Sequence, residues 1–161
     1  MANDNSSARQ KVDSGVHVNE QKWSKKLMDS GWTAMPSVII ERQKALGLEP
    51  LDINIIMHLA TYWWTYDNKP HPAKKTIAEA IGVTPRTVQR RIASLEKSGF
   101  IRREERRVKD KGSKTNLYHF DGLIKAALPY AEEKLQDLAK RDTERKSTVA
   151  RKGRARLQVV K

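Results

Sequence analysis

The residues best suited to chemistry lie in one short stretch, TPRTVQRR, residues 84–91. Guanidinium groups donate paired hydrogen bonds to phosphates or guanine edges, and a side-chain amide can pair with adenine. On a helical wheel with Val88 facing inward, the opposite face carries Arg86, Arg90, Ala93 and Lys97. This face offers the donors that a helix needs to contact a nucleic acid in the major groove, although a solvated basic face is the simpler alternative.

The polar residues of this region divide by their expected contacts. Helices in the major groove usually contact bases from their N-terminal half, so the predicted base contacts are Arg86, Thr87, Gln89 and Arg90. Backbone contacts are predicted for Thr84, at the positive end of the helix, and for Lys74 and Lys75 on the preceding helix. Arg91 falls at the buried edge, where we expect it either to extend its charged end towards solvent or to pair with an acidic group.

A basic β-hairpin is predicted directly after this helix. FIRREERRV and TNLYHF have the composition of strands, and KDKGSK between them is polar and contains glycine. Glu104 and Glu105 interrupt the basic run. Together with the end of the helix, the hairpin supplies the remaining predicted backbone contacts: Lys97, Arg102, Arg103, Arg106, Arg107, Lys109, Lys111 and Lys114.

Two helices and a tight turn, over residues 74–98, must position these side chains. Gly82 permits a sharp turn, Thr84 is a good N-cap, and Pro85 suits a first helical position. Apolar residues at helical spacing give the second helix a buried stripe of Val88, Ile92 and Leu95. The hairpin then occupies residues 100–120.

The rest of the chain predicts helices around this unit. Helices are expected over residues 19–28, 36–46, 53–66 and 122–141, the last interrupted or restarted at Pro129. The third, INIIMHLATYWWTY, is apolar on nearly every side and should lie at the centre of the core. One domain, residues 19–141, would thus lie between a disordered arm, residues 1–18, and a basic disordered tail, residues 142–161.

The aromatic residues allow two interpretations. Tyr62, Trp63 and Trp64 could stack on single-stranded bases. Their place at the end of an apolar, charge-neutral helix favours packing in the core instead. The same interpretation is extended to Trp23 and Trp32, which could alternatively cover a dimer partner.

No signal for catalysis or metal binding is found. There are no cysteines, and the four histidines lack metal-ligand spacing. No nucleophile–base pattern or glycine-rich phosphate loop occurs. We therefore expect neither an enzyme nor a metal, other cofactor or small-molecule ligand.

The net charge of +13 is localised. Residues 1–71 carry eight Lys/Arg and eight Asp/Glu, and residues 122–140 carry three of each. By contrast, residues 72–121 carry thirteen and six, and residues 141–161 carry eight and two. This pattern indicates a polyanionic partner and predicts a DNA-contacting tail through Arg151, Lys152, Arg154 and Arg156, with a solubility-promoting extension as the alternative.

The sequence has no apolar run of about 18 residues, the length that a membrane span requires, and its first residues lack the apolar core of a signal peptide. We expect no membrane association. The predicted location is cytoplasmic, at the nucleoid when the protein is bound to DNA.

The segment TIAEAIGVTPRTVQRRIASLEKSGFIRR resembles the winged-helix domains of bacterial transcription regulators. GWTAMP, TYWW and NLYHFDGLI extend the similarity over residues 31–128, towards helix-turn-helix proteins of bacterial chromosomes, plasmids and phages. The resemblance implies a mainly α fold with a small β-hairpin, a winged helix-turn-helix, that binds double-stranded DNA.

The expected function is that of a sequence-specific DNA-binding protein, a transcriptional repressor or autoregulator. A replication or partition factor of a plasmid or phage is the alternative within DNA binding, and a protein–protein interaction module is the alternative outside it. RNA is disfavoured because a helix cannot enter the narrow A-form major groove. The final helix could pair with its copy in a homodimer or only cover the core.

Overall fold

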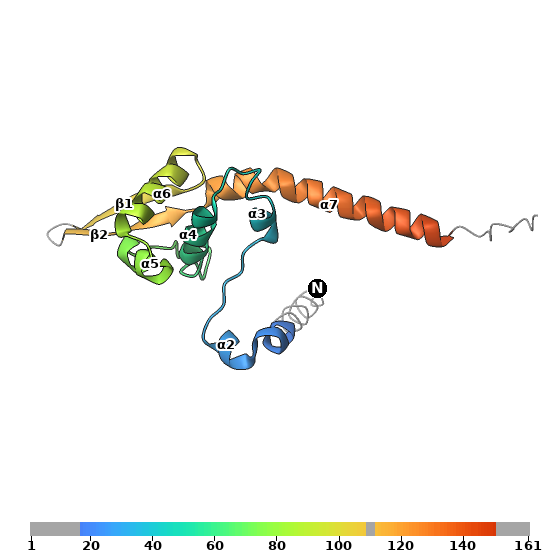
Figure 1. Cartoon of the computed structure of the whole chain (residues 1–161), viewed down its shortest axis with the longest axis horizontal. Helices are drawn as coiled ribbons and strands as arrows, with labels where there is room; N and C mark the ends of the chain where they lie inside the picture. The colour runs from blue at the N-terminus through green and yellow to red at the C-terminus, as the bar shows by residue number, and fades with distance from the viewer. Residues whose placement is uncertain (1–16, 109–111, 151–161) are drawn as a thin grey trace, which may run out of the picture.

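The computed structural model describes residues 17–108 and 112–150 of the chain. Four helices, α3 (Ser37–Glu41), α4 (Pro50–Ala60), α5 (Lys74–Ile81) and α6 (Pro85–Lys97), surround one core. A hairpin of β1 (Arg102–Val108) and β2 (Gly112–His119) and the long helix α7 (Asp121–Ala150) leave this domain in opposite directions (Figure 1). The helix α2 (Lys25–Asp29) lies apart from it. The predicted fold class, mainly α with a small β-hairpin, is confirmed.

The core is built around α4, as predicted. Ile55, Ile56 and Leu59 of this helix are at most 1% exposed. The apolar stripe of α6 is buried as well, and Ile77 of α5 joins the same cluster. The helices α4, α5 and α6 pack against one another, so the hydrophobic effect fixes which side of α6 faces outward.

The turn between α5 and α6 has the expected geometry. Gly82 adopts a left-handed conformation with φ 72°, which costs glycine little. The Val83 N–H then donates to the Ala78 carbonyl over 3.0 Å. Thr84 caps α6 by accepting a hydrogen bond from the Thr87 N–H, and Pro85 follows at the first helical position.

Three of the predicted helices are shorter than expected or broken. The helix predicted over residues 53–66 begins earlier, at Pro50, where Glu49 and Asp52 form a capping box, and it ends at Ala60. The helix predicted over residues 36–46 is helical only in α3 and continues as turns to residue 47. The segment predicted as one helix over residues 19–28 is interrupted at Ser24, whose φ is 73°.

The early end of α4 changes the environment of the aromatic residues. Trp63 packs on the core, with its ring 5.4 Å from that of Phe120. Trp64, however, is 67% exposed, and Tyr62, Trp23 and Trp32 are exposed as well. Core packing was therefore the wrong prediction for all but Trp63. Tyr62 and Trp64 follow the end of α4, where successive residues cannot all face one core, and Trp23 and Trp32 lie in the segment before α3.

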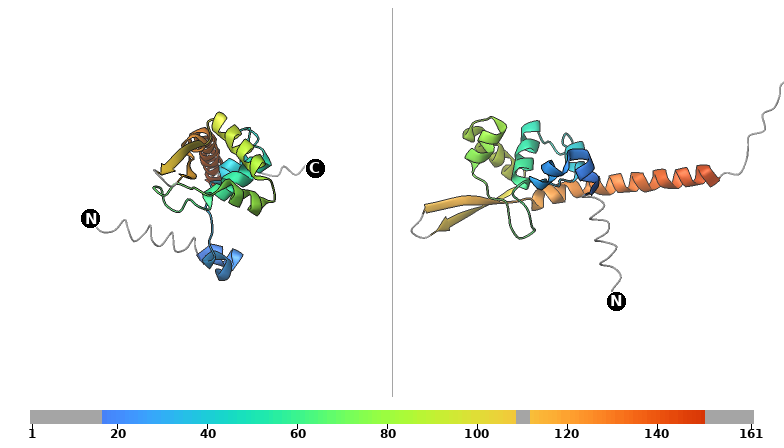
Figure 2. Two further views of the ribbon diagram at one scale, coloured as in Figure 1. Left: turned by 90° about the vertical axis from the view of Figure 1, so that its left-hand side faces the viewer. Right: turned by 90° about the horizontal axis from the view of Figure 1, so that it is seen from below.

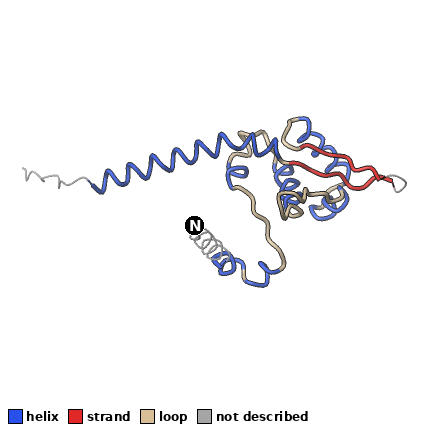
Figure 3. Tube along the Cα trace, turned by 180° about the vertical axis from the view of Figure 1, so that it is seen from behind, coloured by secondary structure: helices blue, strands red, loops and turns tan. Residues whose placement is uncertain are grey.

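The hairpin is an antiparallel pair with an irregularity between Glu104 and Arg106. Its strands, red in Figure 3, project from the helical domain. Near the domain, the Tyr118 N–H donates to the Pro70 carbonyl over 2.9 Å. This bond attaches the segment before α5 to the second strand and holds the base of the hairpin beside the helices.

Helix α7 is longer than predicted. It runs to Ala150 rather than residue 141, so residues 142–150 of the predicted disordered tail are helical. Ion pairs one turn apart stabilise a helix without any tertiary contact, and Lys146 pairs with Asp142 over 2.7 Å. The remaining tail residues, 151–161, and residues 1–16 of the predicted arm lie outside the described residues.

In the described part of the chain, no helix combines the length and the apolar character that crossing a bilayer requires.

Candidate nucleic-acid interface

The outer face of α6 presents Arg86, Gln89 and Arg90 to solvent, opposite the fully buried Val88. Across residues 17–108 and 112–150, neither Arg86 nor Arg90 forms a hydrogen bond or an ion pair with another side chain. Lys97, at the end of the helix, is exposed too. The predicted outward arginines thus have their donors available to a ligand.

The two threonines at the start of α6 belong to its cap. The Thr84 hydroxyl lies 2.9 Å from the Thr87 hydroxyl and accepts from the Thr87 N–H at 3.1 Å. Thr87 is also half-buried. Because both hydroxyls already have partners, Arg86, Gln89 and Arg90 are the stronger candidates for base contacts.

Helix α5 touches the edge of this surface. The Lys74 ammonium donates to the Gln89 side-chain carbonyl over 3.4 Å, which leaves the Gln89 amide N–H groups for another acceptor. Lys75 instead lies 3.8 Å from Glu79 on its own helix. In the part of the chain that the structure describes, no side chain caps the N-terminus of α5, so its first backbone N–H groups add to the positive potential there.

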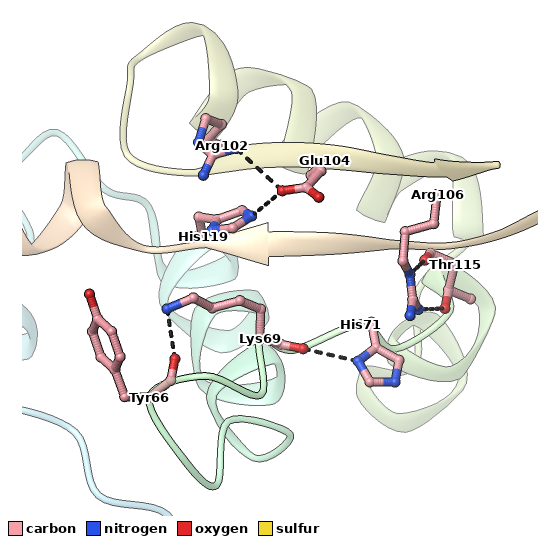
Figure 4. Close-up of polar contacts among 8 residues, drawn as sticks. All are labelled: Tyr66, Lys69, His71, Arg102, Glu104, Arg106, Thr115 and His119. Carbon is pink, nitrogen blue, oxygen red and sulfur yellow. Dashed lines mark hydrogen bonds and ion pairs between the residues drawn. The ribbon is translucent and has the colours of Figure 1, made fainter.

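Most of the arginines in the hairpin have partners within the molecule (Figure 4). Arg102 lies 3.6 Å from Glu104, which also contacts the His119 ring at 2.9 Å. The Arg106 guanidinium donates to the Thr115 carbonyl and hydroxyl over 2.8 and 3.1 Å.

Arg103 pairs with Glu96 of α6 over 3.3 Å. These partners hold the guanidinium groups close to the hairpin and reduce their reach towards a phosphate.

The other predicted contacts in the hairpin and tail are less defined. Lys114 is exposed on β2, and Arg107 occupies β1 opposite Ser113. The remaining residues predicted to contact the backbone lie outside the described residues: Lys109, Lys111, Arg151, Lys152, Arg154 and Arg156.

A groove between the start of α5 and the hairpin was not predicted from the sequence. It has a volume of about 480 Å³, and its lining brings three basic residues and one acidic residue to one place: Lys74 of α5, Arg103 and Glu105 of β1, and Lys114 of β2. No local signal could reveal it, because its walls come from segments about thirty to forty residues apart. The groove continues the basic surface from α6 towards the hairpin.

Arg91 points inward and fixes the orientation of α6. Its guanidinium pairs with Asp52, through Nε at 2.8 Å and a second, shorter contact from Nη2, and it also reaches Glu49 at 3.0 Å. The hydrogen bond with Asp52 raises the pKa of Arg91 above its ordinary value. Pairing of Arg91 with an acid is confirmed, but the partners, on α4 and its cap, could not be identified from spacing.

The Asp52 carboxylate is 3% exposed and also accepts the Glu49 backbone N–H over 2.9 Å. One buried carboxylate therefore starts α4 and anchors α6. This shared anchor holds α6 in the orientation that its buried stripe requires, with Arg86 and Arg90 facing outward.

Comparisons with known proteins agree with this architecture. Residues 46–101 match the family model of a helix-turn-helix domain. The fold is similar to the N-terminal domain of the DnaD protein from Geobacillus kaustophilus HTA426, with a TM-score of 0.51 and 15% identity over 74% of this chain and 96% of that one.

A second solved structure, the transcriptional regulator PA3341, matches with a TM-score of 0.37 and 21% identity over 70% of this chain and 85% of that one. No curated protein matches the sequence. The fold is a winged helix-turn-helix, with the hairpin forming a wing after the second helix of the motif.

Proposed function

We propose that the protein binds double-stranded DNA sequence-specifically, with α6 in the major groove, and acts as a transcriptional repressor or autoregulator in the cytoplasm. The observation that carries the proposal is the outer face of α6. Arg86 and Arg90 have no partner there among residues 17–108 and 112–150, they lie beside the amide of Gln89, and these side chains can distinguish guanine and adenine edges.

The surroundings of α6 support contacts with the phosphate backbone. Lys74 and the uncapped start of α5 lie at one edge of α6, and the basic groove extends to the wing. The paired arginines of the hairpin would have to exchange an internal partner for a phosphate. Lys97 needs no such exchange, so we propose it, with Lys74, as the stronger backbone contact.

Selection from random duplexes tests the proposal. The wild type should enrich one sequence, and Arg90→Ala should weaken binding to it by about 1–3 kcal/mol and relax the preference at one base pair. Lys140→Ala on the exposed part of α7 removes the same charge away from α6 and is the matched control. Its affinity should stay close to that of the wild type.

An Arg90→Ala protein that selects the same sequence with unchanged affinity would exclude this binding mode. Failure of the wild type to enrich any duplex would favour a protein–protein module instead. The genomic position of the selected sequence, beside a promoter or in a replication region, separates transcriptional regulation from replication or partition.

A further inference from the structure

Helix α7 carries an exposed apolar stripe, made of Ile124, Leu128, Ala131, Leu135 and Leu138. The four large side chains are 44% to 66% exposed. Steps of four and three residues alternate along the stripe, which is the 3.5-residue period of a coiled-coil seam. Val149, 87% exposed, falls on the same period near the end of the helix.

Apart from Ala131, which is partly buried against the core, the stripe is not the face with which α7 covers its own domain. Leu123 and Ala127 are buried against the core, and further along Lys134 pairs with Glu41 of α3 over 2.7 Å. On a helical wheel of 100° per residue, the midpoint of Leu123, Ala127 and Lys134 lies about a quarter turn from the midpoint of the stripe. Beyond them, α7 projects from the domain as a rod (Figure 2), so a second helix has room along its side.

We propose that a second copy of this chain covers the stripe, and that two α7 helices pair as an antiparallel coiled coil. A seam with a 3.5-residue period, apolar from Ile124 to Leu138 and again at Val149, fits another helix of the same period. Two-fold pairing uses the same stripe on both copies, so the face is self-complementary.

The charges of α7 decide the orientation. Residues 132–137 carry three acidic groups and one basic group, whereas residues 140–146 carry four basic and two acidic. On the seam itself, Asp142 and Arg145 occupy the positions between Leu138 and Val149. In a parallel pair in register, Asp142 would face the partner's Asp142, and Arg145 would face the partner's Arg145.

Antiparallel helices avoid this repulsion. With Leu135 opposite the partner's Leu138, Ile124 falls opposite the partner's Val149, so large apolar residues meet at the centre and at both ends. Between these points Leu128 faces the partner's Arg145 and Ala131 faces the partner's Asp142. The more basic end of each helix then lies closer to the acidic middle of its partner. The pairing does not depend on the proposed DNA binding and can fail independently of it.

Light scattering on the full chain over a range of concentrations tests the pairing. The wild type should be a dimer, and Leu135→Glu/Leu138→Glu should be a monomer with unchanged thermal unfolding of the domain. The control Gln136→Glu/Lys140→Gln changes the charge equally on another face of α7 and should remain a dimer. A monomeric wild type, or a dimeric Leu135→Glu/Leu138→Glu protein, would overturn the proposal.

Cysteine crosslinking tests the orientation, because the chain has no cysteine of its own. Ile124→Cys and Val149→Cys should each fail to crosslink alone, and a mixture of the two should form a disulfide-linked heterodimer. Efficient crosslinking of either variant with itself would show parallel helices and overturn the antiparallel arrangement.

Discussion

Arg90 and Arg91 are neighbours in the sequence with opposite roles in the structure. Arg90 is exposed on the proposed DNA-contacting face, and Arg91 is paired with two acidic groups at the edge of the core. One step along a helix turns a side chain by 100°, which is enough to separate ligand contact from structural support.

Replacing Arg91 with alanine should therefore destabilise the fold. It leaves the Asp52 carboxylate buried without a cation, a change that costs about 3 kcal/mol. Urea unfolding measures the loss. Arg90→Ala, with the same change in composition, should stay within about 0.5 kcal/mol of the wild type. Equal stabilities for the two variants would show that the Asp52–Arg91 pair does not anchor α6.

Tyr118 makes stability sensitive to alkaline pH. Burial raises the pKa of its hydroxyl above the ordinary value of 10.0, because the charged form loses its hydration. The folded-state pKa thus exceeds the unfolded one, so the stability contributed by neutral Tyr118 is complete below about pH 10 and declines as the pH rises from there towards the folded pKa.

Urea unfolding of the wild type and Tyr118→Phe at neutral pH and above pH 10 isolates this effect from that of other titrating groups. The stability difference between the two proteins should shift in favour of the phenylalanine variant at the higher pH. A stability difference that does not change with pH would contradict this role of Tyr118.

At the scale of elements, the start of α7 depends on a close backbone contact. A Cβ atom on Gly122 would lie 1.7 Å from the Gly99 carbonyl oxygen, a separation that no side chain can occupy. The Leu123 N–H meanwhile donates to the Phe100 carbonyl over 2.9 Å. This contact joins α7 to the loop between α6 and β1, and so connects the projecting rod to the helix-turn-helix.

Gly122→Ala should lower the free energy of unfolding by about 3 kcal/mol or more, since backbone atoms must move to admit the methyl group. Thermal unfolding measures this loss. Gly47→Ala is the comparison, because its Cβ would meet nothing within 4 Å and only its φ of 71° is unfavourable, which costs about 1 kcal/mol. If Gly122→Ala lowers the free energy of unfolding no more than Gly47→Ala does, the contact between Gly122 and Gly99 does not hold the loop against α7.

For the whole molecule, the basic residues beyond α7 should strengthen binding to DNA of any sequence. Residues 151–161 contain five Lys/Arg and no acidic residue. Each phosphate that they neutralise releases counterions, which contributes about 0.9 to the slope of log affinity against log salt.

A chain ending at Ala150 keeps α7 intact, and it should bind all duplexes more weakly and with a shallower salt dependence. Binding titrations at several salt concentrations, with a selected and a random duplex, measure both quantities. A full-length variant with Gln at Arg151, Lys152, Arg154 and Arg156 controls for chain length. Loss of affinity for the selected duplex alone would rule out a non-specific arm.

The sequence by itself determined the helix-turn-helix, the hairpin after it and the outward face of α6. Those features depend on signals that act over a few residues: the cap at Thr84, Pro85, the turn at Gly82 and the 3.6-residue period of the buried stripe. Local conformational preference and burial agree there, so little else is needed to specify the structure.

Only the tertiary structure decided how distant groups meet. Arg91 and Asp52 are 39 residues apart, and Arg106 and Thr115 meet across the hairpin, so no spacing rule pairs them. The exposure of Trp64 depends on where α4 ends, and the close contact of Gly122 depends on a loop from another element. Composition and periodicity carry no information about such contacts, because folding brings these groups together across long stretches of chain.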